Sequence, residues 1–439
     1  MNTQQRTSSS EHPIFENQVE FLFRLIDPLR ATSDRAPEQY RFVPEVRSWA
    51  IPIGIGLALL VLTVALGMAG AEEGHLFSQR FYFAYLIGWV FCVTISLGGL
   101  FFVMLQHLTT AEWSVVVRRI PEILMMNFPV LIIFGLPVVF GMHDLYHWTH
   151  ADLYEVGGEN YDPILAAKQS YLNPPFFIAR LAVYFGLWTY LSFRLYKLSI
   201  SQDVDPQPGE GRMAEERKVS AWGMLVFAFT TGFAGFDILM SVDPHWFSTM
   251  FGVYFFAGTF FVILASVTMM ALMLQRAGYL NGVITVEHYH DLGKFMFGFT
   301  VFWAYIAFSQ YMLIWYANLP EETVWFRVRM EGGWGYASLA LIFGHFVIPF
   351  LVLAFRASKR SKGVMMFMTF WFLLVHFFDL YWLTMPVVNH NFTFELIDIT
   401  GWLGLVLFFA GLIVLRARRH ATVPYNDPKL AASLAFENA

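Results

Sequence analysis

Four titratable side chains interrupt long apolar stretches of this sequence, and their chemical types are those that carry protons. Asp237 and Asp379 each lie near the end of an apolar run, and His376 precedes Asp379 by one helical turn on the same face. His345 lies at a similar depth in the preceding run. Charged groups inside a membrane are costly and usually face a partner or a wet cavity, and imidazole changes its protonation near neutral pH. The pattern predicts a proton relay built from Asp379, His376 and His345, with Asp237 as a further candidate.

Other interpretations of these residues stay open. Buried polar side chains also join helices through hydrogen bonds, and paired histidines can ligate a b-type haem. Arg180, at the start of another apolar run, is placed to pair with Asp237 or with a quinone head group. The sequence does not decide between these partners, so Asp237 and Arg180 form a candidate quinone pocket.

A charged patch opens the seventh apolar run. Its members recur at steps of three to four residues on one helical face, and they are Glu287, His290, Asp291 and Lys294. Tyr305 and Ser309 continue close to the same direction. The patch is either an entrance that takes protons toward the middle of the bundle or a solvated first turn whose lysine extends to the interface.

A histidine-rich segment follows the third run. Its side chains have types that can ligate a metal, and they are His143, Asp144, His147, His150 and Asp152. No single helical face collects them, so the pattern favours a solvated helix end, and we predict no metal site.

The composition places the chain in a membrane. Hydrophobic residues make up 57% of the sequence and charged residues 14%, against about 25% charged in soluble domains. The single cysteine, Cys92, excludes a disulfide framework, a c-type haem attachment and an iron–sulfur cluster held by this chain's own thiolates. No basic stripe indicates nucleic-acid binding, and no nucleotide fingerprint or nucleophile elbow is present. We therefore expect no cofactor bound by this chain alone, except for quinol.

Ten runs are long enough to cross a bilayer, which takes about 20 residues each. They cover residues 48–70, 81–107, 122–144, 175–199, 219–241, 247–275, 291–317, 334–357, 363–386 and 396–417. Pro129 and Pro137 interrupt the third run. Before it, residues 109–112 match a capping box that opens a short surface helix ending at Arg118 and Arg119. The fold class is an all-α integral membrane protein.

The distribution of basic residues predicts the orientation. With both termini on one side, that side holds 22 of the 28 lysines and arginines, so both termini should be cytoplasmic. Residues 13–29 carry an apolar helical stripe and predict an interfacial helix. We found no apolar core with a small-residue cleavage site in the first 47 residues, and expect no signal peptide.

Short matches recur between the two halves of the chain. Phe193–Arg194 with Lys197 and Ser199 is repeated 162 residues later, Phe236–Asp237 with Pro244 is repeated 142 residues later, and Met104–Leu105–Gln106 recurs at 273–275. Three matches in the same order predict two repeated four-helix bundles with two flanking helices. The expected segments are 1–47, an N-terminal cytoplasmic part; 48–80, the first span and outer loop; 81–243 and 244–390, the two bundles; and 391–439, the last span and tail.

Three long segments resemble a known family. They are FDILMSVDPHWFSTMFGVYFFAG within 235–258, HYHDLGKFMFGFTVFWAYIAFSQYMLIWYANLPEET at 288–323 and AYLIGWVFCVTISLGGLFFVMLQHLTTAEWSVVVRR at 84–119. The sequence is similar to the smaller of two related polytopic subunits of bacterial alternative complex III, a quinol:cytochrome c (or other acceptor) oxidoreductase. That family belongs with the membrane anchors of polysulfide- and nitrite-reductase-type enzymes.

The resemblance implies a subunit of the bacterial inner membrane without a redox centre of its own. Haem c and iron–sulfur clusters are expected in partner subunits, namely multihaem cytochromes c and an iron–sulfur subunit, beside a larger sister polytopic subunit that oxidises most of the quinol. The smaller subunit is implied to carry a proton path. No histidine accompanies Asp237 at the position that matches His376, which weakens a quinol site in the first bundle.

Two other functions are compatible with the same residues. Internal repeats and charge at mid-membrane depth also suit an ion- or solute-coupled secondary transporter, but such proteins usually interrupt matching helices in both halves. Here Pro129 and Pro137 interrupt one half. The other alternative is a purely structural membrane anchor.

Overall fold

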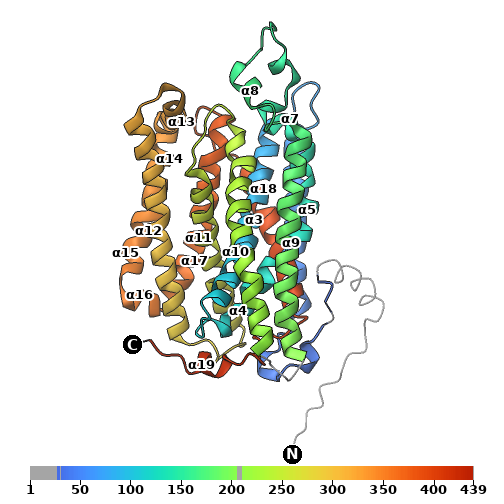
Figure 1. Ribbon diagram of the computed structural model, residues 1–439, viewed down its shortest axis with the longest axis vertical. Helices are drawn as coiled ribbons and strands as arrows, with labels where there is room; N and C mark the ends of the chain where they lie inside the picture. Colours follow the sequence, from blue (N-terminus) through green and yellow to red (C-terminus); the bar gives the residue numbers. More distant parts are fainter. Residues whose placement is uncertain (1–26, 30, 205–209, 439) are drawn as a thin grey trace, which may run out of the picture.

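The computed structural model describes residues 27–29, 31–204 and 210–438, and within them the regular structure is helical. Ten helices are long and apolar enough to cross a membrane, which confirms the all-α prediction and the ten spans. They run side by side, with the described ends of the chain on one side and the hairpin that carries α8 projecting on the other (Figure 1). We call these the terminal side and the hairpin side of this multi-pass membrane protein. The predicted helix over 13–29 lies almost entirely outside the described residues.

The spans have the following bounds. They are α2 (Val46–Ala69), α3 (Gln79–Leu108), α4 to α6 (Val115–Met125, Phe128–Phe134, Leu136–Phe140), α9 (Pro174–Val204), α10 (Glu210–Ile238), α11 (Phe251–Arg276), α12 (Val286–Ala317), α14, η6 and α15 (Gly332–Leu341, Ile342–Val347, Ile348–Ala354), α17 (Lys362–Thr384) and α18 (Leu396–Ala417). Shorter helices include α7 (Met142–Leu145), α8 (Pro163–Lys168), α13 (Pro320–Met330), α16 (Arg356–Arg360) and α19 (Leu430–Leu434).

The third span begins earlier than predicted. The helix α4 starts at Val115 and runs directly into the bundle, so Arg118 and Arg119 are buried inside it, and the predicted surface helix is wrong. The span then breaks at Asn127, two residues before Pro129, whose ring and missing N–H disfavour a continuous helix. Arg416 of α18 donates to the carbonyl of Ile123 (3.0 Å) and to Asn127 Oδ1 (2.6 Å) at this break. The interruption of this span is therefore confirmed and is stabilised by a buried guanidinium.

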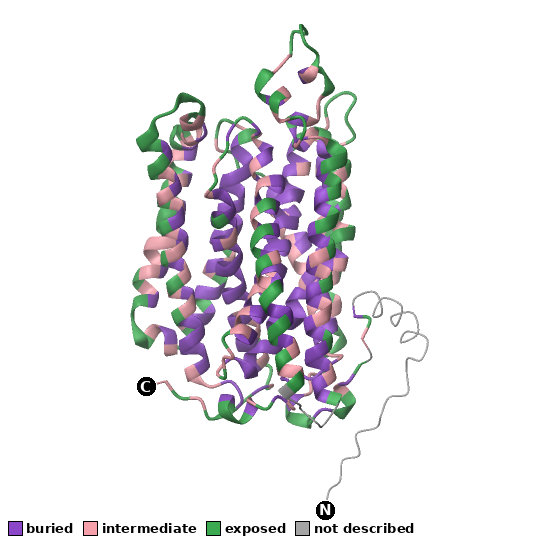
Figure 2. Cartoon of the chain, viewed as in Figure 1, coloured by how far each residue is buried: buried purple, intermediate pink, exposed green. Residues whose placement is uncertain are grey.

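Two central helices organise the packing. The helix α3 packs on α4, α5, α9 and α10, which we call the first bundle, while α11 packs with α12 and α17, which with α14 to α15 form the second bundle. Contacts between α3 and α11 join the bundles. Burial is highest along these central helices, and exposed apolar residues line the outside, where lipid would contact them (Figure 2). The expected segment boundaries at 81–243 and 244–390 stay a prediction.

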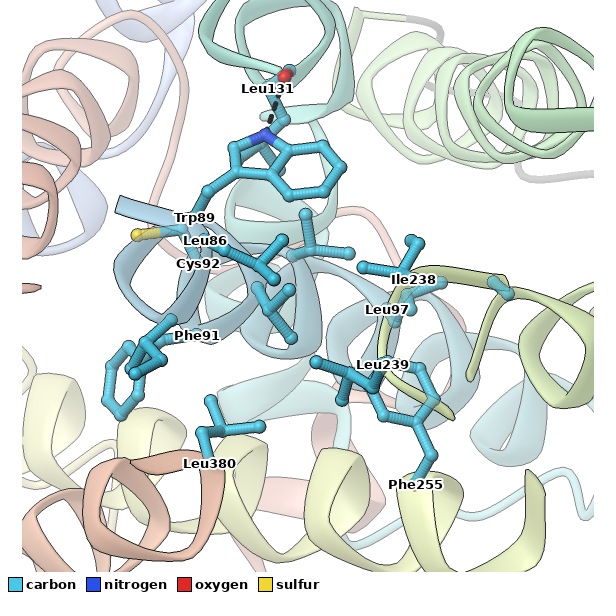
Figure 3. Close-up of a cluster of buried hydrophobic side chains, with 14 of the residues drawn as sticks. Leu86, Trp89, Phe91, Cys92, Leu97, Leu131, Ile238, Leu239, Phe255 and Leu380 are labelled. Carbon is cyan, nitrogen blue, oxygen red and sulfur yellow. Dashed lines mark hydrogen bonds between the residues drawn. The ribbon is translucent and has the colours of Figure 1, made fainter. Parts of the chain in front are cut away.

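The bundles share an apolar centre near α3. Trp89 fills part of it and donates its ring N–H to the Leu131 carbonyl at 2.9 Å, so a polar atom in this region keeps a partner. Figure 3 shows the surrounding side chains, which come from α3, from the end of α10 and from α11 and α17: Leu86, Phe91, Cys92, Leu97, Ile238, Leu239, Phe255 and Leu380. This contiguous packing fixes the two bundles against each other.

The matching FRxxKxS segments differ in conformation. Residues 193–199 continue the long helix α9, whereas α15 ends at Ala354 and Phe355 is extended (ψ 137°) before α16. Lys359 explains the difference, because its Nζ donates to the Leu353 carbonyl (2.7 Å) at the end of α15. Its side chain also fills the space beside Gly293 of α12. The sequence match at this point therefore does not carry a matching backbone.

The flanking helices α2 and α18 pack on each other through glycines. A Cβ atom added to Gly56 would lie 2.6 Å from the backbone nitrogen of Phe408 and 2.8 Å from the Gly404 carbonyl, whereas Gly54 has nothing within 4 Å. We expect Gly56→Ala to lower the free energy of unfolding by about 1–3 kcal/mol because the helices must separate. Gly54→Ala should be neutral or stabilising. Reversible unfolding in mixed detergent micelles measures both, and equal stabilities would contradict the packing described here.

The chain after α18, residues 418–438, crosses the terminal side of both bundles, and we call it the strap. Tyr425 donates to the Asp203 carbonyl of α9 (2.5 Å), Ser433 donates to the Trp113 carbonyl (2.9 Å), and Asn438 donates to the Glu287 carbonyl (3.1 Å). The strap thus contacts the ends of helices from both halves of the chain.

The strap begins at a clasp with the N-terminal segment. His420 contacts Asp27 (2.9 Å) and Thr32 (2.9 Å), and the Arg419 carbonyl accepts from two backbone N–H groups of that segment. Burial raises the pKa of Asp27, but the His420 hydrogen bond and nearby positive charge outweigh it and hold the pKa below its usual value. Burial lowers the pKa of His420 more than Asp27 raises it.

These pKa shifts predict that acid loosens the clasp. Both pKa values are lower in the folded state, so the unfolded state binds more protons and stability falls with falling pH. The His420 contribution should decline below about pH 6.5 and the Asp27 contribution below about pH 4. We expect hydrogen-exchange protection of residues 31–42, corrected for intrinsic rates, to be lower at about pH 5 than at about pH 7.5. Protection that does not change with pH would contradict this prediction, and His420→Asn should remove most of the dependence.

Candidate functional site

The carboxylate of Asp237 is fully occupied by neighbours on α9. Arg180 donates from Nε to Oδ2 (2.9 Å) and from Nη2 to Oδ1 (3.0 Å), and the Tyr184 hydroxyl donates to Oδ2 (2.8 Å). Arg180 also donates to the Tyr171 carbonyl (2.8 Å), and its guanidinium lies 3.8 Å from the ring centroid of Tyr171. Of the two partners considered for Arg180, the structure places it on Asp237. This paired charge joins α9 to α10 and matches the structural interpretation of Asp237.

Asp379 has a different environment, although the sequence repeat matches it to Asp237. The Tyr254 hydroxyl of α11 donates to Oδ1, and the Trp303 ring N–H of α12 donates to Oδ2 at 3.3 Å. Within the described part of the chain, no lysine or arginine lies within ion-pair distance of this carboxylate. Asp379 is buried, with 2% of its surface exposed. Asp379 is therefore held by neutral donors, whereas Asp237 is held by a cation.

His376 lies beside Asp379 on α17, as predicted. Its Nε2 lies 3.0 Å from the Thr94 hydroxyl of α3, and that hydroxyl donates its hydrogen to the Phe91 carbonyl (2.8 Å). Thr94 must then accept from His376, which assigns the proton of the neutral ring to Nε2. The other ring nitrogen, Nδ1, is buried without a hydrogen-bond partner in the described residues. Both His376 and Asp379 border Gly258 of α11, where an added Cβ atom would lie 3.2 Å from Cε1 of His376 and 3.9 Å from Oδ2 of Asp379.

His345 lies in the π-helical turn η6, between two aromatic rings. Trp303 stacks on it with ring centroids 3.7 Å apart, and Phe261 stacks on it at 4.0 Å. The ring is fully buried, and neither nitrogen has a hydrogen-bond partner in the described chain. The π-turn shifts the hydrogen-bond ladder, and Trp371 donates to the Gly344 carbonyl at 2.7 Å. Such turns are frequent at functional sites.

These side chains form one cluster, which we call the relay cluster: Tyr254, Trp303, His345, His376 and Asp379. Trp303 connects its parts, because its N–H contacts Asp379 and its ring face covers His345. The predicted convergence of His345, His376 and Asp379 is found, and four helical spans contribute to it. Nothing in the sequence marks Tyr254 and Trp303, because they are ordinary aromatic residues in aromatic-rich helices. A donor facing Asp379 could not be assigned without the packing of α11 and α12.

The charged patch at the start of α12 also comes together, on the terminal side. Arg360 donates to both oxygens of Glu287 (2.7 and 2.6 Å), and these hydrogen bonds raise the pKa of Arg360. Lys294 contacts Asp291 and donates to Asn438 of the strap (2.8 Å). His290 is buried, and its Nδ1 lacks a partner in the described chain. The strap therefore covers this patch.

Tyr305 and Ser309 do not face the relay cluster. Tyr305 has 64% of its surface exposed, and Ser309 is half-buried. Residues two positions apart on a helix point in nearly opposite directions. Tyr305 therefore faces outward because Trp303 faces inward. On the buried side of α12, Thr300 and Gln310 are the polar side chains that accompany Trp303.

The histidines of the hairpin side line a cavity of about 320 Å³ without gathering as ligands. His143 and His150 stack with ring centroids 4.0 Å apart, and His75 pairs with Asp144 at 3.0 Å. Burial and the neighbouring imidazole of His150 lower the pKa of His147. Among the described residues, no three histidine, cysteine or acidic side chains converge to hold a metal ion.

A second buried ionic cluster was missed from the sequence. It lies at the terminal end of the first bundle and contains His107, Arg118, Arg119, Glu122, Asp203, Glu216 and Asp427. Arg118 and Arg119 lie four and three residues before Glu122. This spacing places them on one helical face, but the predicted third span begins only at residue 122.

Comparisons with protein-family models and with curated proteins found no match. We therefore infer function from the geometry of the two carboxylates and the helices around them.

Proposed function

We propose that this chain is a membrane subunit of a respiratory quinol:cytochrome c (or other acceptor) oxidoreductase complex, without a redox centre of its own, and that its second bundle conducts protons. The observation that carries the proposal is the environment of Asp379. Tyr254 can donate to its carboxylate or accept from its carboxylic acid, so both protonation states find a partner. A carboxyl group that can change its proton without leaving its partners suits a relay inside a membrane.

The proposed path starts at the patch formed by Glu287, His290, Asp291 and Lys294 and leads to the relay cluster. About 13 residues of α12, or roughly 20 Å, separate the two. Thr300 is the buried polar side chain of α12 between them, so transfer over this distance requires water molecules. Tyr305 and Ser309 do not face the relay cluster, so they belong to the path only if protons enter it from the outer surface of the bundle.

The first bundle has a structural part in this proposal. The Arg180–Asp237 pair is saturated by protein groups, which supports a link between helices, and a quinone pocket there would require the pair to open. The expected neighbours are a larger sister polytopic subunit, an iron–sulfur subunit, multihaem cytochromes c and lipid. The bias of lysine and arginine supports cytoplasmic termini in a bacterial inner membrane.

Isolation from native membranes tests the proposed complex. A tagged chain solubilised in mild detergent should co-purify with a second polytopic protein, an iron–sulfur protein and c-type cytochromes visible by their haem absorption. A chain that purifies alone, without haem absorption and with affinity for a transported solute, would overturn the assignment.

A further inference from the structure

A small chamber lies where the first bundle meets the strap. Its wall comes from the ends of α3, α4 and α10 and from the strap, and the residues used here are Gln106, His107, Arg118, Glu216, Asp427 and Lys429. The volume of the chamber is about 20 Å³, enough for about one water molecule. The side chains of His107, Arg118, Glu216 and Asp427 are each at most 5% exposed.

Most charges around this chamber are paired. Arg118 contacts Asp427 and lies 3.4 Å from Glu122, Arg119 donates to Asp203 (2.8 Å), and Ser199 donates to Glu122 (2.7 Å). These contacts give a hydrogen bond to three of the four buried carboxylates, which are Asp427, Asp203 and Glu122. The fourth is Glu216.

Glu216 has an ion-pair neighbour but no hydrogen bond in the described chain. Its Oε2 lies 3.6 Å from Nδ1 of His107, which is beyond hydrogen-bond distance. Its Oε1 and His107 Nε2 are both buried without a partner among the described residues, as is Oε1 of Gln106. Unpartnered buried polar atoms are costly, and a buried water molecule typically bonds to such atoms where a polar cavity has room for it. A water molecule in the chamber would give the unpartnered atoms of Glu216 and His107 a partner.

We propose that Glu216, His107 and a water molecule in this chamber hold one exchangeable proton. The proton resides either on the Glu216 carboxyl beside a neutral imidazole or on the His107 imidazolium beside a carboxylate, so transfer between them changes no net charge. The charged groups that face Glu216 are Arg118 and Arg212, which favour the carboxylate, and Glu122 and Asp427, which favour the acid. The site is separate from the relay cluster and does not depend on it.

The strap closes this chamber toward the terminal side. Asp427 contacts Arg118, and Lys429 donates from Nζ to the Thr110 carbonyl (2.6 Å) and from its backbone N–H to Asp427 (2.8 Å). The strap therefore forms part of the wall between Glu216 and water on that side. We expect loosening of these contacts to speed exchange of the proton.

Infrared spectroscopy of the full-length chain in lipid nanodiscs tests the site. A pH-sensitive carboxyl C=O band should be present, should shift in D₂O and should be lost in Glu216→Gln. Glu215→Gln is the matched control, because Glu215 is the adjacent residue and pairs with Arg194 at the surface, and the band should persist there. It should also persist in Asp379→Asn, which keeps this test separate from the relay proposal. Because Asp379 can give a carboxyl band of its own, Glu216→Gln is also made in the Asp379→Asn background. A band that is absent there before Glu216 is changed, or that survives the change, would overturn the inference.

Two further variants decide the matter if Glu216→Gln fails to fold. His107→Gln removes the proton-sharing partner and should move the midpoint of the band's titration by at least about one pH unit. Asp427→Asn weakens the closure and should speed deuterium exchange of the band by about tenfold or more. An unmoved midpoint together with unchanged exchange would show that the carboxyl group has a structural role alone.

Discussion

Replacing Asp379 with asparagine should stop proton movement through this subunit while leaving the assembled complex intact. Asparagine has nearly the same shape. Its carbonyl oxygen can accept from the Trp303 N–H, and its NH2 group can donate to the Tyr254 hydroxyl, which can also act as an acceptor. Asparagine cannot release and regain a proton. Removing a positioned proton-transfer group typically costs a factor of about 10²–10⁴ in rate, so we expect proton translocation per electron to fall at least about tenfold, with quinol oxidation largely kept.

The measurement is proton release during quinol oxidation by the complex in proteoliposomes, with a pH-sensitive dye. Thr384→Val is the matched control. Thr384 is buried on the same helix, and its hydroxyl donates to the Leu380 carbonyl within α17. That variant should translocate protons normally. If Asp379→Asn assembles and keeps the proton yield of the unmodified complex, the relay through Asp379 is wrong and the second bundle is an anchor.

The sequence predicted the spans because a bilayer imposes one simple requirement. About 20 apolar residues in a row cross it, and every predicted run corresponds to one of the ten long helices. The same requirement explains why a surface helix was wrongly predicted to end at Arg118 and Arg119. A pair of arginines is read as an interface signal, yet here the strap supplies Asp427 from more than 300 residues away to neutralise Arg118 inside the bundle. No local pattern indicates such a partner.

The relay cluster was predictable in part for a related reason. His345, His376 and Asp379 stand out because polar residues are rare in apolar helices, and helical spacing sets the face of each. Their partners do not stand out. Trp303 and Tyr254 are two of many aromatic residues, and the stacking of Trp303 on His345 depends on how α12 packs against the π-turn.

The comparison of Asp237 with Asp379 assigns different roles to two residues that the repeat makes equivalent. Arg180 neutralises Asp237, whereas Arg329, a buried arginine of α13, donates to the carbonyls of Trp382 and Leu383. Arg329 therefore holds the end of α17, and the Asp379 carboxylate is bound by neutral donors alone among the described residues. The proposal thus assigns a structural link to Asp237 and an exchangeable proton to Asp379.

Removal of Arg180 should destabilise the first bundle more than removal of both partners. Arg180→Met leaves Asp237 buried with only the Tyr184 hydroxyl, and an unpaired buried charge typically costs about 3–5 kcal/mol. The double variant Arg180→Met with Asp237→Leu removes both charges, and replacing a buried ion pair by apolar residues is often neutral or stabilising. We therefore expect the double variant to recover most of the loss.

Unfolding in mixed detergent micelles measures both variants, and quinol oxidation by the complex separates structure from binding. If the pair only joins α9 to α10, the stable double variant oxidises quinol at the normal rate, since no substrate contact has been lost. If Arg180 also binds a quinone head group, the double variant stays folded but its KM for quinol rises. A double variant as unstable as Arg180→Met alone would contradict the ion-pair argument, because the cost would then come from lost packing of the long arginine side chain against Tyr171 and Phe176.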